Sequence, residues 1–138
     1  MKKIYYNKLV RDRIPEKITR NGGEYKIEKL GQKAFERELV LKVGEEAGGL
    51  LGAKDKEDFT SELADVLDVI EEIKQVWHIS EREIRSAQKR AYETKGGFKK
   101  KLFLVWSSDT GYRTNERRYS KKKKRLMKNV ATADQYMA

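Results

Sequence analysis

A run of apolar residues at helical spacing between residues 57 and 77 constrains this chain more than any other feature of its sequence. The run consists of Phe59, Leu63, Val66, Leu67, Ile70, Ile73 and Trp77. Residues three and four positions apart share one side of a helix, so the pattern predicts an amphipathic helix from about Glu57 to Trp77. The apolar side of such a helix must pack against another element, and a second helix is the natural partner.

A second amphipathic helix is predicted from Gln32 to about Ala53, where apolar residues also recur every three or four positions. Ser80 and Glu83 have the spacing of a capping box. They predict the start of a third helix that extends to about Thr94.

The remaining segments are shorter. Residues 11–23 predict a short helix with Pro15 in its first turn and two glycines at its end. Two segments predict short strands from their β-prone or alternating residues, and a third predicts a strand or an extended segment. They are KIYYNKL at 3–9, EYKIEKL at 24–30 and FKKKLFLVW at 98–106. The expected fold class is therefore mainly α, with a minor β component from short strands near both ends of the domain.

The charge of the chain is unevenly distributed. The 138 residues carry a formal net charge of +10, and residues 99–138 hold 12 Lys or Arg against 3 Asp or Glu. The first 98 residues are thus close to neutral. Charged residues make up 39% of the chain and hydrophobic residues 38%, which suits one domain with a modest core. We expect a domain at 1–106 followed by a basic, flexible tail at 107–138.

Several classes of protein are excluded by composition. The chain has no cysteine, so it has neither a disulfide framework nor a sulfur-bound metal. It has no run of about 18 apolar residues that would span a membrane, and its basic start is not followed by the apolar run of a secretory signal. These features predict a cytoplasmic protein with no membrane partner.

Three carboxylates are expected at the seam between the two long helices. Glu62 and Asp65 are three residues apart, which places them on one face of their helix. Glu46 points into the apolar arc of its own helix, where an unpaired charge is costly. Clusters of oxygen ligands suit Mg²⁺ or Mn²⁺, although acidic pairs at this spacing also occur as solvated surface.

The segments EEAGGLL and ELADVLDVIEEI resemble the paired ExxE and ExxD motifs of the MazG-like all-α nucleoside triphosphate pyrophosphohydrolases. NKLVRDRIPEKI and KRAYETKGGFKKKLFL resemble, in the same order, a MazG-related subgroup often labelled phosphoribosyl-ATP pyrophosphohydrolase-like. The resemblance covers about residues 4–105. It implies a MazG-like helical bundle, a homodimer or higher homo-oligomer, and metal-dependent cleavage between the α and β phosphates of a nucleotide.

Carried over position by position, the resemblance assigns Glu46, Glu62 and Asp65 as catalytic metal ligands for Mg²⁺, with Mn²⁺ as a substitute. Gly49 stands where the fourth carboxylate is expected. Neighbouring acids are candidates to replace that carboxylate, among them Glu45, Asp68 and Glu72. The glycine pair at 48 and 49 would alternatively make room for a ligand or for a closely packed helix.

The resemblance also implies that two basic groups contact substrate phosphates. They are Lys8, Arg11 and Arg13 near the start of the chain and Lys89, Arg90 and Lys95 before the second glycine pair. The alternative is that they are solvated charges. A third basic group lies in the tail and could bind nucleic acid weakly through its phosphates. It consists of Arg117, Arg118, Lys121, Lys122, Lys123, Lys124 and Arg125.

Three functions therefore remain in view. The first is an Mg²⁺-dependent pyrophosphohydrolase acting on a nucleoside triphosphate or related nucleotide. The second is a catalytically weakened relative that binds nucleotides, because Gly49 replaces an expected carboxylate. The third is a nucleic-acid-associated protein that acts through its basic tail.

Overall fold

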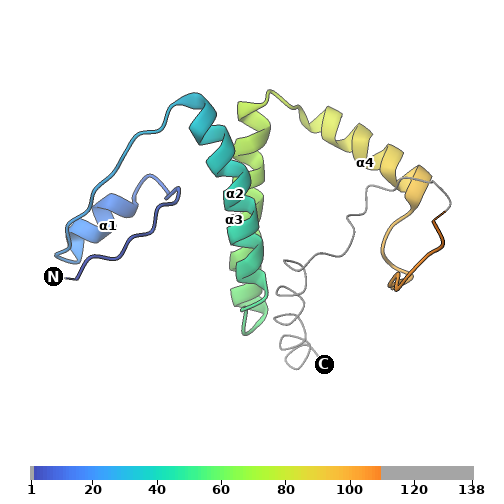
Figure 1. Ribbon diagram of the computed structural model, residues 1–138, viewed down its shortest axis with the longest axis horizontal. Helices are drawn as coiled ribbons and strands as arrows, with labels where there is room; N and C mark the ends of the chain where they lie inside the picture. Colours follow the sequence, from blue (N-terminus) through green and yellow to red (C-terminus); the bar gives the residue numbers. More distant parts are fainter. Residues whose placement is uncertain (1, 110–138) are drawn as a thin grey trace. The chain divides into compact units, whose positions relative to one another are not determined.

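The computed structural model describes residues 2–109, which contain four helices (Figure 1). They are α1 (Ile14–Arg20), α2 (Gln32–Leu50), α3 (Lys56–Val76) and α4 (Glu81–Lys95). The chain divides into two units, Met1–His78 and Ile79–Ala138. The predicted tail lies almost entirely outside the described residues, so its assignment as a separate region stays a prediction.

The helix ends follow local rules that are visible in the sequence. Pro15 lies in the first turn of α1, where its missing N–H costs no helical hydrogen bond. Gly22, just after α1, has a φ of 74°, a left-handed conformation that glycine adopts without strain. At the start of α3, the Asp55 carboxylate accepts a hydrogen bond of 2.8 Å from the Asp58 N–H. The end of α2 was predicted at about Ala53, but the helix stops at Leu50 and a turn follows.

In the first unit α2 and α3 pack against each other as a helical hairpin. Leu39 of α2 is 5% exposed, and no other hydrophobic residue among residues 2–109 is classed as buried. On α3, Val66, Val69 and Ile73 are half-buried and recur at three- and four-residue spacing. They mark the side of α3 that faces α2.

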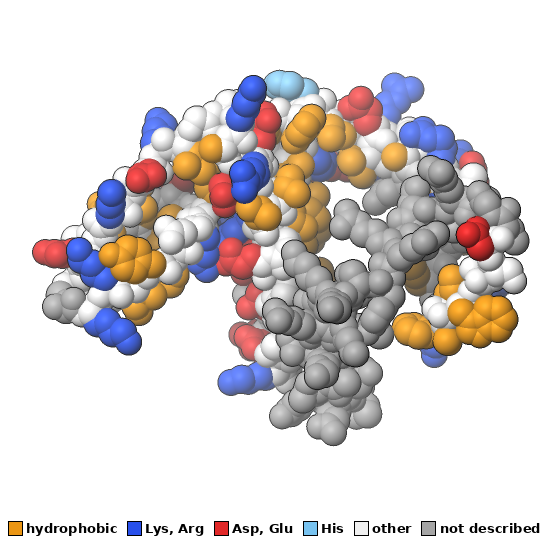
Figure 2. Space-filling view, in the orientation of Figure 1, with side chains coloured by type: hydrophobic (Ala, Val, Ile, Leu, Met, Phe, Trp, Pro, Cys, Tyr) orange, Lys and Arg blue, Asp and Glu red, His pale blue; other side chains and the backbone are white. Residues whose placement is uncertain are grey.

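The packing of α2 against α3 covers only part of the apolar stripe that was predicted on α3. A second set of apolar side chains on α3 remains exposed, and Leu67 is 57% exposed. The set consists of Phe59, Leu63, Leu67, Ile70 and Trp77. Hydrophobic side chains are visible at the surface in the space-filling view (Figure 2). A single chain therefore leaves one apolar side of α3 uncovered within the first unit.

The three predicted strands are absent from the described residues. Residues 3–9, 24–30 and 98–106 have no regular secondary structure, and no strand occurs anywhere between residues 2 and 109. A strand is stabilised by hydrogen bonds to a neighbouring strand, so β-prone composition is insufficient without a partner. The expected minor β component is therefore not shown in this part of the chain, whereas the mainly helical fold class is confirmed.

The second unit contains α4, whose capping box is formed as predicted. The Glu83 N–H donates to the Ser80 hydroxyl over 3.1 Å, and the Ser80 N–H donates to the Glu83 carboxylate over 2.7 Å. The hydrogen bond from the Ser80 N–H lowers the pKa of Glu83 below its usual value. Gly96, with a φ of 77°, follows the last helical residue. The apolar side chains beyond it are exposed, and Phe98 is 98% exposed.

None of the helices among the described residues combines the length and the hydrophobicity needed to cross a bilayer.

Replacing Ser80 by alanine should destabilise the start of α4 by about 1 kcal/mol, the usual effect of losing a helix cap. The measurement is hydrogen exchange of the amides in the first turn of α4 in the full-length chain. Ser86→Ala is the matched control, because Ser86 is exposed inside the same helix and alanine has the higher helix propensity. Faster exchange in Ser80→Ala but not in Ser86→Ala is expected. Equal rates would show that the cap contributes nothing.

Candidate metal centre

The hairpin brings acidic residues of both helices to one place. On α2, Glu46 lies seven residues after the buried Leu39, which puts it on the stripe that faces α3. On α3, Glu62 and Asp65 are half-buried, unlike their exposed neighbours Ser61 and Leu63. The helical packing that covers Leu39 therefore also brings these three carboxylates together.

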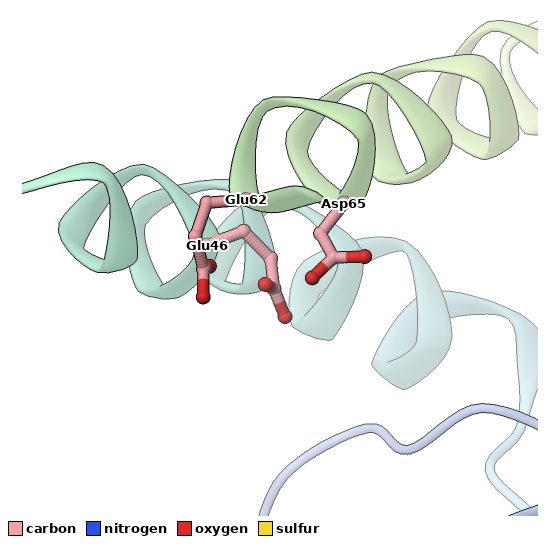
Figure 3. A group of neighbouring side chains, drawn as sticks. All are labelled: Glu46, Glu62 and Asp65. Carbon is pink, nitrogen blue, oxygen red and sulfur yellow. The ribbon is translucent and has the colours of Figure 1, made fainter. Parts of the chain in front are cut away.

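Glu46, Glu62 and Asp65 each offer one oxygen, and these oxygens all lie within 4.8 Å of one another. Their carboxylates point to the same side of the hairpin (Figure 3). Two ligand oxygens on opposite sides of Mg²⁺ lie about 4.2 Å apart, because each Mg–O bond is about 2.1 Å long. Small side-chain movements would bring the three oxygens into range of one ion. The oxygen donors and their spacing fit a hard divalent cation.

Cationic side chains lie beside two of the three carboxylates. Lys42 Nζ is 3.3 Å from Glu46 Oε1, one turn away on α2. Arg11 Nη2 donates to Asp65 Oδ1 over 2.9 Å. Glu62 has no ion pair among residues 2–109. These contacts reduce the repulsion that three neighbouring carboxylates would otherwise exert on one another.

None of the three additional candidate ligands is part of this group: Glu45 and Asp68 lie beside it, and Glu72 is exposed on α3. Glu45 accepts hydrogen bonds from Lys8 over 2.6 Å and from Lys42 over 3.2 Å. The hydrogen bond from Lys8 is the largest cause of the lowered pKa of Glu45. Asp68 accepts a hydrogen bond of 2.7 Å from Arg11. Glu45 and Asp68 are thus paired with cations of the segment that precedes α1.

Lys8 and Arg11 attach that segment to the hairpin. Arg11 reaches Asp65 and Asp68 with the same Nη2 atom. These hydrogen bonds raise the pKa of the guanidinium above its usual value, and the hydrogen bond to Asp68 has the largest effect. The hydrogen bond to Glu45 likewise raises the pKa of Lys8. Both side chains stay charged at neutral pH. Arg13, the third cation predicted here, is the N-cap residue of α1.

The two glycines that follow Glu46 have different surroundings. A Cβ added at Gly48 would meet nothing within 4 Å. A Cβ added at Gly49 would lie 3.1 Å from Cδ of Glu62 and closer still to its Oε2. Gly49 therefore leaves space for the Glu62 carboxylate to lie against the last turn of α2. This agrees with the alternative in which the glycine makes room, here for a candidate ligand from α3.

The other predicted binding residues lie outside the first unit. Lys89, Arg90 and Lys95 lie on α4 in the second unit, and Lys89 forms an ion pair of 4.0 Å with Glu93. The tail cations that were predicted to bind nucleic acid lie outside the described residues. Nucleic-acid binding by the tail therefore stays a prediction.

One neighbour of the carboxylates was not anticipated. Lys42 is a mostly buried cation, with 14% of its side chain exposed, and it contacts both Glu45 and Glu46. The signal was present in the sequence, because residues three and four positions apart are neighbours on a helix. Arg11 could not be found in this way, since it is 54 residues from Asp65.

No protein-family model, no curated protein and no solved structure matches the chain.

Gly48→Ala should stabilise the chain by up to about 1 kcal/mol, because alanine is the better helix former and its methyl group meets open space. Gly49→Ala has the same gain in propensity but must displace the Glu62 carboxylate, so its net stabilisation should be smaller. Urea unfolding of the two variants and the parent chain measures the difference. Equal stabilisation would show that Glu62 does not occupy the space beside Gly49.

Proposed function

We propose that the chain is a cytoplasmic, Mg²⁺-dependent nucleotide pyrophosphohydrolase that cleaves between the α and β phosphates of a nucleoside triphosphate or related nucleotide and releases pyrophosphate. The observation that carries the proposal is the convergence of Glu46, Glu62 and Asp65 within 4.8 Å. These are the positions that match the ExxE and ExxD motifs in the resemblance. Two independent lines, motif position and spatial proximity, thus select the same three residues.

The electrostatics of the site also favour a bound cation. Gly49 lies in the last turn of α2, the end of the helix that carries the negative partial charge of the helix dipole. The Glu62 carboxylate lies beside this turn without an ion pair among the described residues. A carboxylate at a helix C-terminus is unfavourable, and a cation held there would relieve both negative groups.

In the proposed reaction, Glu46, Glu62 and Asp65 would hold Mg²⁺, with Mn²⁺ as the substitute. The bound ion would neutralise charge on the phosphates and orient a water molecule for attack on phosphorus. Lys8 and Arg11 supply positive charge at the same side of the hairpin, where they can contact phosphate oxygens. Arg13 on the same segment and Lys89, Arg90 and Lys95 on α4 are further proposed phosphate contacts.

Gly49 supports a second candidate, a relative that binds nucleotides but hydrolyses them poorly. The chain has three carboxylates where the motifs of the resemblance have four. Gly49→Glu would add the fourth, and the Glu62 side chain would have to turn to make space for it. Because the obstacle is the flexible end of a side chain, this substitution is physically accessible.

The chain is further proposed to act as a homodimer or higher homo-oligomer. Two observations on the described residues of the first unit support this proposal: the exposed apolar set on α3, and Leu39 as the one buried hydrophobic residue. The same apolar faces on a second copy would complete it. A bundle assembled in this way is also what the resemblance implies.

The proposed activity is tested by measuring pyrophosphate release from common and modified nucleoside triphosphates with Mg²⁺ or Mn²⁺. Glu62→Gln should lower turnover at least about 100-fold, beyond the usual effect of outer-shell partners, and should also weaken Mn²⁺ binding. It removes a candidate ligand without breaking an ion pair of the described residues. Glu57→Gln, a change at an exposed residue in the first turn of α3, is the matched control. It should leave both turnover and Mn²⁺ binding unchanged.

Each result of this assay separates the candidates. Turnover that disappears with a chelator and with Glu62→Gln supports the pyrophosphohydrolase. Absence of turnover together with a nucleotide-dependent rise in Tm supports the binding protein. Full activity of Glu62→Gln would remove Glu62 from the site.

The oligomeric state is tested by light scattering of the full-length chain. We expect a dimer or larger assembly, and Leu67→Lys should weaken it because a charge would be buried at the interface. Ser61→Lys introduces the same charge on the same helix, about 120° away at 100° per residue, and should leave the assembly intact. A parent chain that is monomeric at all concentrations would contradict the proposal.

A further inference from the structure

Arg11 binds one of the three candidate metal ligands. Its guanidinium donates to Asp65 over 2.9 Å and to Asp68 over 2.7 Å through a single nitrogen. Arg11 comes from a segment without regular secondary structure, and 59% of its side chain is exposed. The same segment carries Lys8, which pairs with Glu45. The two cations thus hold the segment against the acidic side of the hairpin.

The ion pairs of Arg11 should be easy to break. An exposed salt bridge contributes only about 0–1 kcal/mol, since water screens the charges and the long side chain loses freedom. A divalent ion at Asp65 would be repelled by a guanidinium on the same carboxylate. Binding of the two cations at Asp65 is therefore expected to be antagonistic.

A released guanidinium has a better partner in a phosphate. Arginine presents parallel N–H donors that match two phosphate oxygens, and this bidentate contact is stronger than a single shared nitrogen. Lys8 would move with it, because only a few residues separate the two side chains along the segment. Lys8 and Arg11 can then neutralise the acids before substrate binds and contact the substrate phosphates afterwards.

We infer that Arg11 is an exchangeable counter-ion: it neutralises Asp65 and Asp68 in the metal-free protein, leaves them when a divalent cation binds, and transfers to the substrate phosphates. This inference depends on the proposed function, because it needs the metal site and a phosphorylated substrate. It gives Arg11 a positioning role that differs from that of a fixed outer-shell partner. A fixed partner would orient Asp65 and strengthen metal binding, whereas an exchangeable one opposes it.

The two roles predict opposite effects of Arg11→Gln. For an exchangeable counter-ion, the full-length variant should bind Mn²⁺ about two- to fivefold more tightly in the absence of nucleotide, because a competing exposed ion pair worth up to about 1 kcal/mol is lost. It should also require a higher nucleotide concentration for half-maximal binding or turnover. Arg11→Lys keeps the charge and should restore Mn²⁺ affinity close to that of the parent chain.

The measurement is the concentration of free Mn²⁺ by electron paramagnetic resonance, which requires no turnover. Arg20→Gln is the matched control, because Arg20 pairs with Glu16 within α1 and should not affect Mn²⁺. The tightening in Arg11→Gln should decrease at high salt, where exposed charges are screened. Weaker or unchanged Mn²⁺ binding in Arg11→Gln would overturn the inference.

These outcomes are separable from failure of the proposed function. Equal Mn²⁺ binding by the parent chain and Arg11→Gln, with binding still lost in Glu62→Gln, overturns the exchange but leaves the metal site. Absence of Mn²⁺ binding in every variant overturns both.

Discussion

The carboxylates of Glu46, Glu62 and Asp65 lie close enough to repel one another, and cations from two parts of the chain lie beside them. The three carboxylates meet because α2 and α3 pack along the stripe that contains Leu39. Lys42 offsets the charge from within α2, and Arg11 offsets it from a distant part of the chain. The acidic group is thus both the candidate reactive centre and the point at which the segment before α1 is attached to the hairpin.

The hairpin covers only part of the apolar surface of α3 within the first unit. A helix with apolar residues on two sides needs two neighbours, and α3 has only α2 within the first unit. Its second apolar set remains exposed. One buried hydrophobic residue contributes a small fraction of the stabilisation that a domain requires. Assembly of copies would supply the missing contacts and would place rigid walls around the carboxylates.

Glycine placement connects the packing to the chemistry. Glycine is unfavourable inside a helix, yet Gly49 occupies the seam where a side chain would collide with Glu62. Its neighbour Gly48 has no such contact, and nothing in the structure explains it. The missing carboxylate at position 49 therefore has a structural consequence as well as a chemical one. It lets an acid from α3 approach the negatively polarised end of α2, an arrangement that favours a cation.

The sequence by itself determined the four helices and most of their ends, because periodicity, caps and glycine stops act within a few residues. The exception is α2, which ends at Leu50 and not at about Ala53. It also placed Glu46, Glu62 and Asp65 toward a common seam, since helical spacing sets the direction of each side chain. Only the tertiary structure decided which apolar side of α3 is covered, and that the β-prone segments find no partner among residues 2–109. It alone brought Arg11 to Asp65 across 54 residues. Local geometry is encoded in neighbouring residues, whereas strand pairing and long-range ion pairs depend on which surfaces meet when the chain folds.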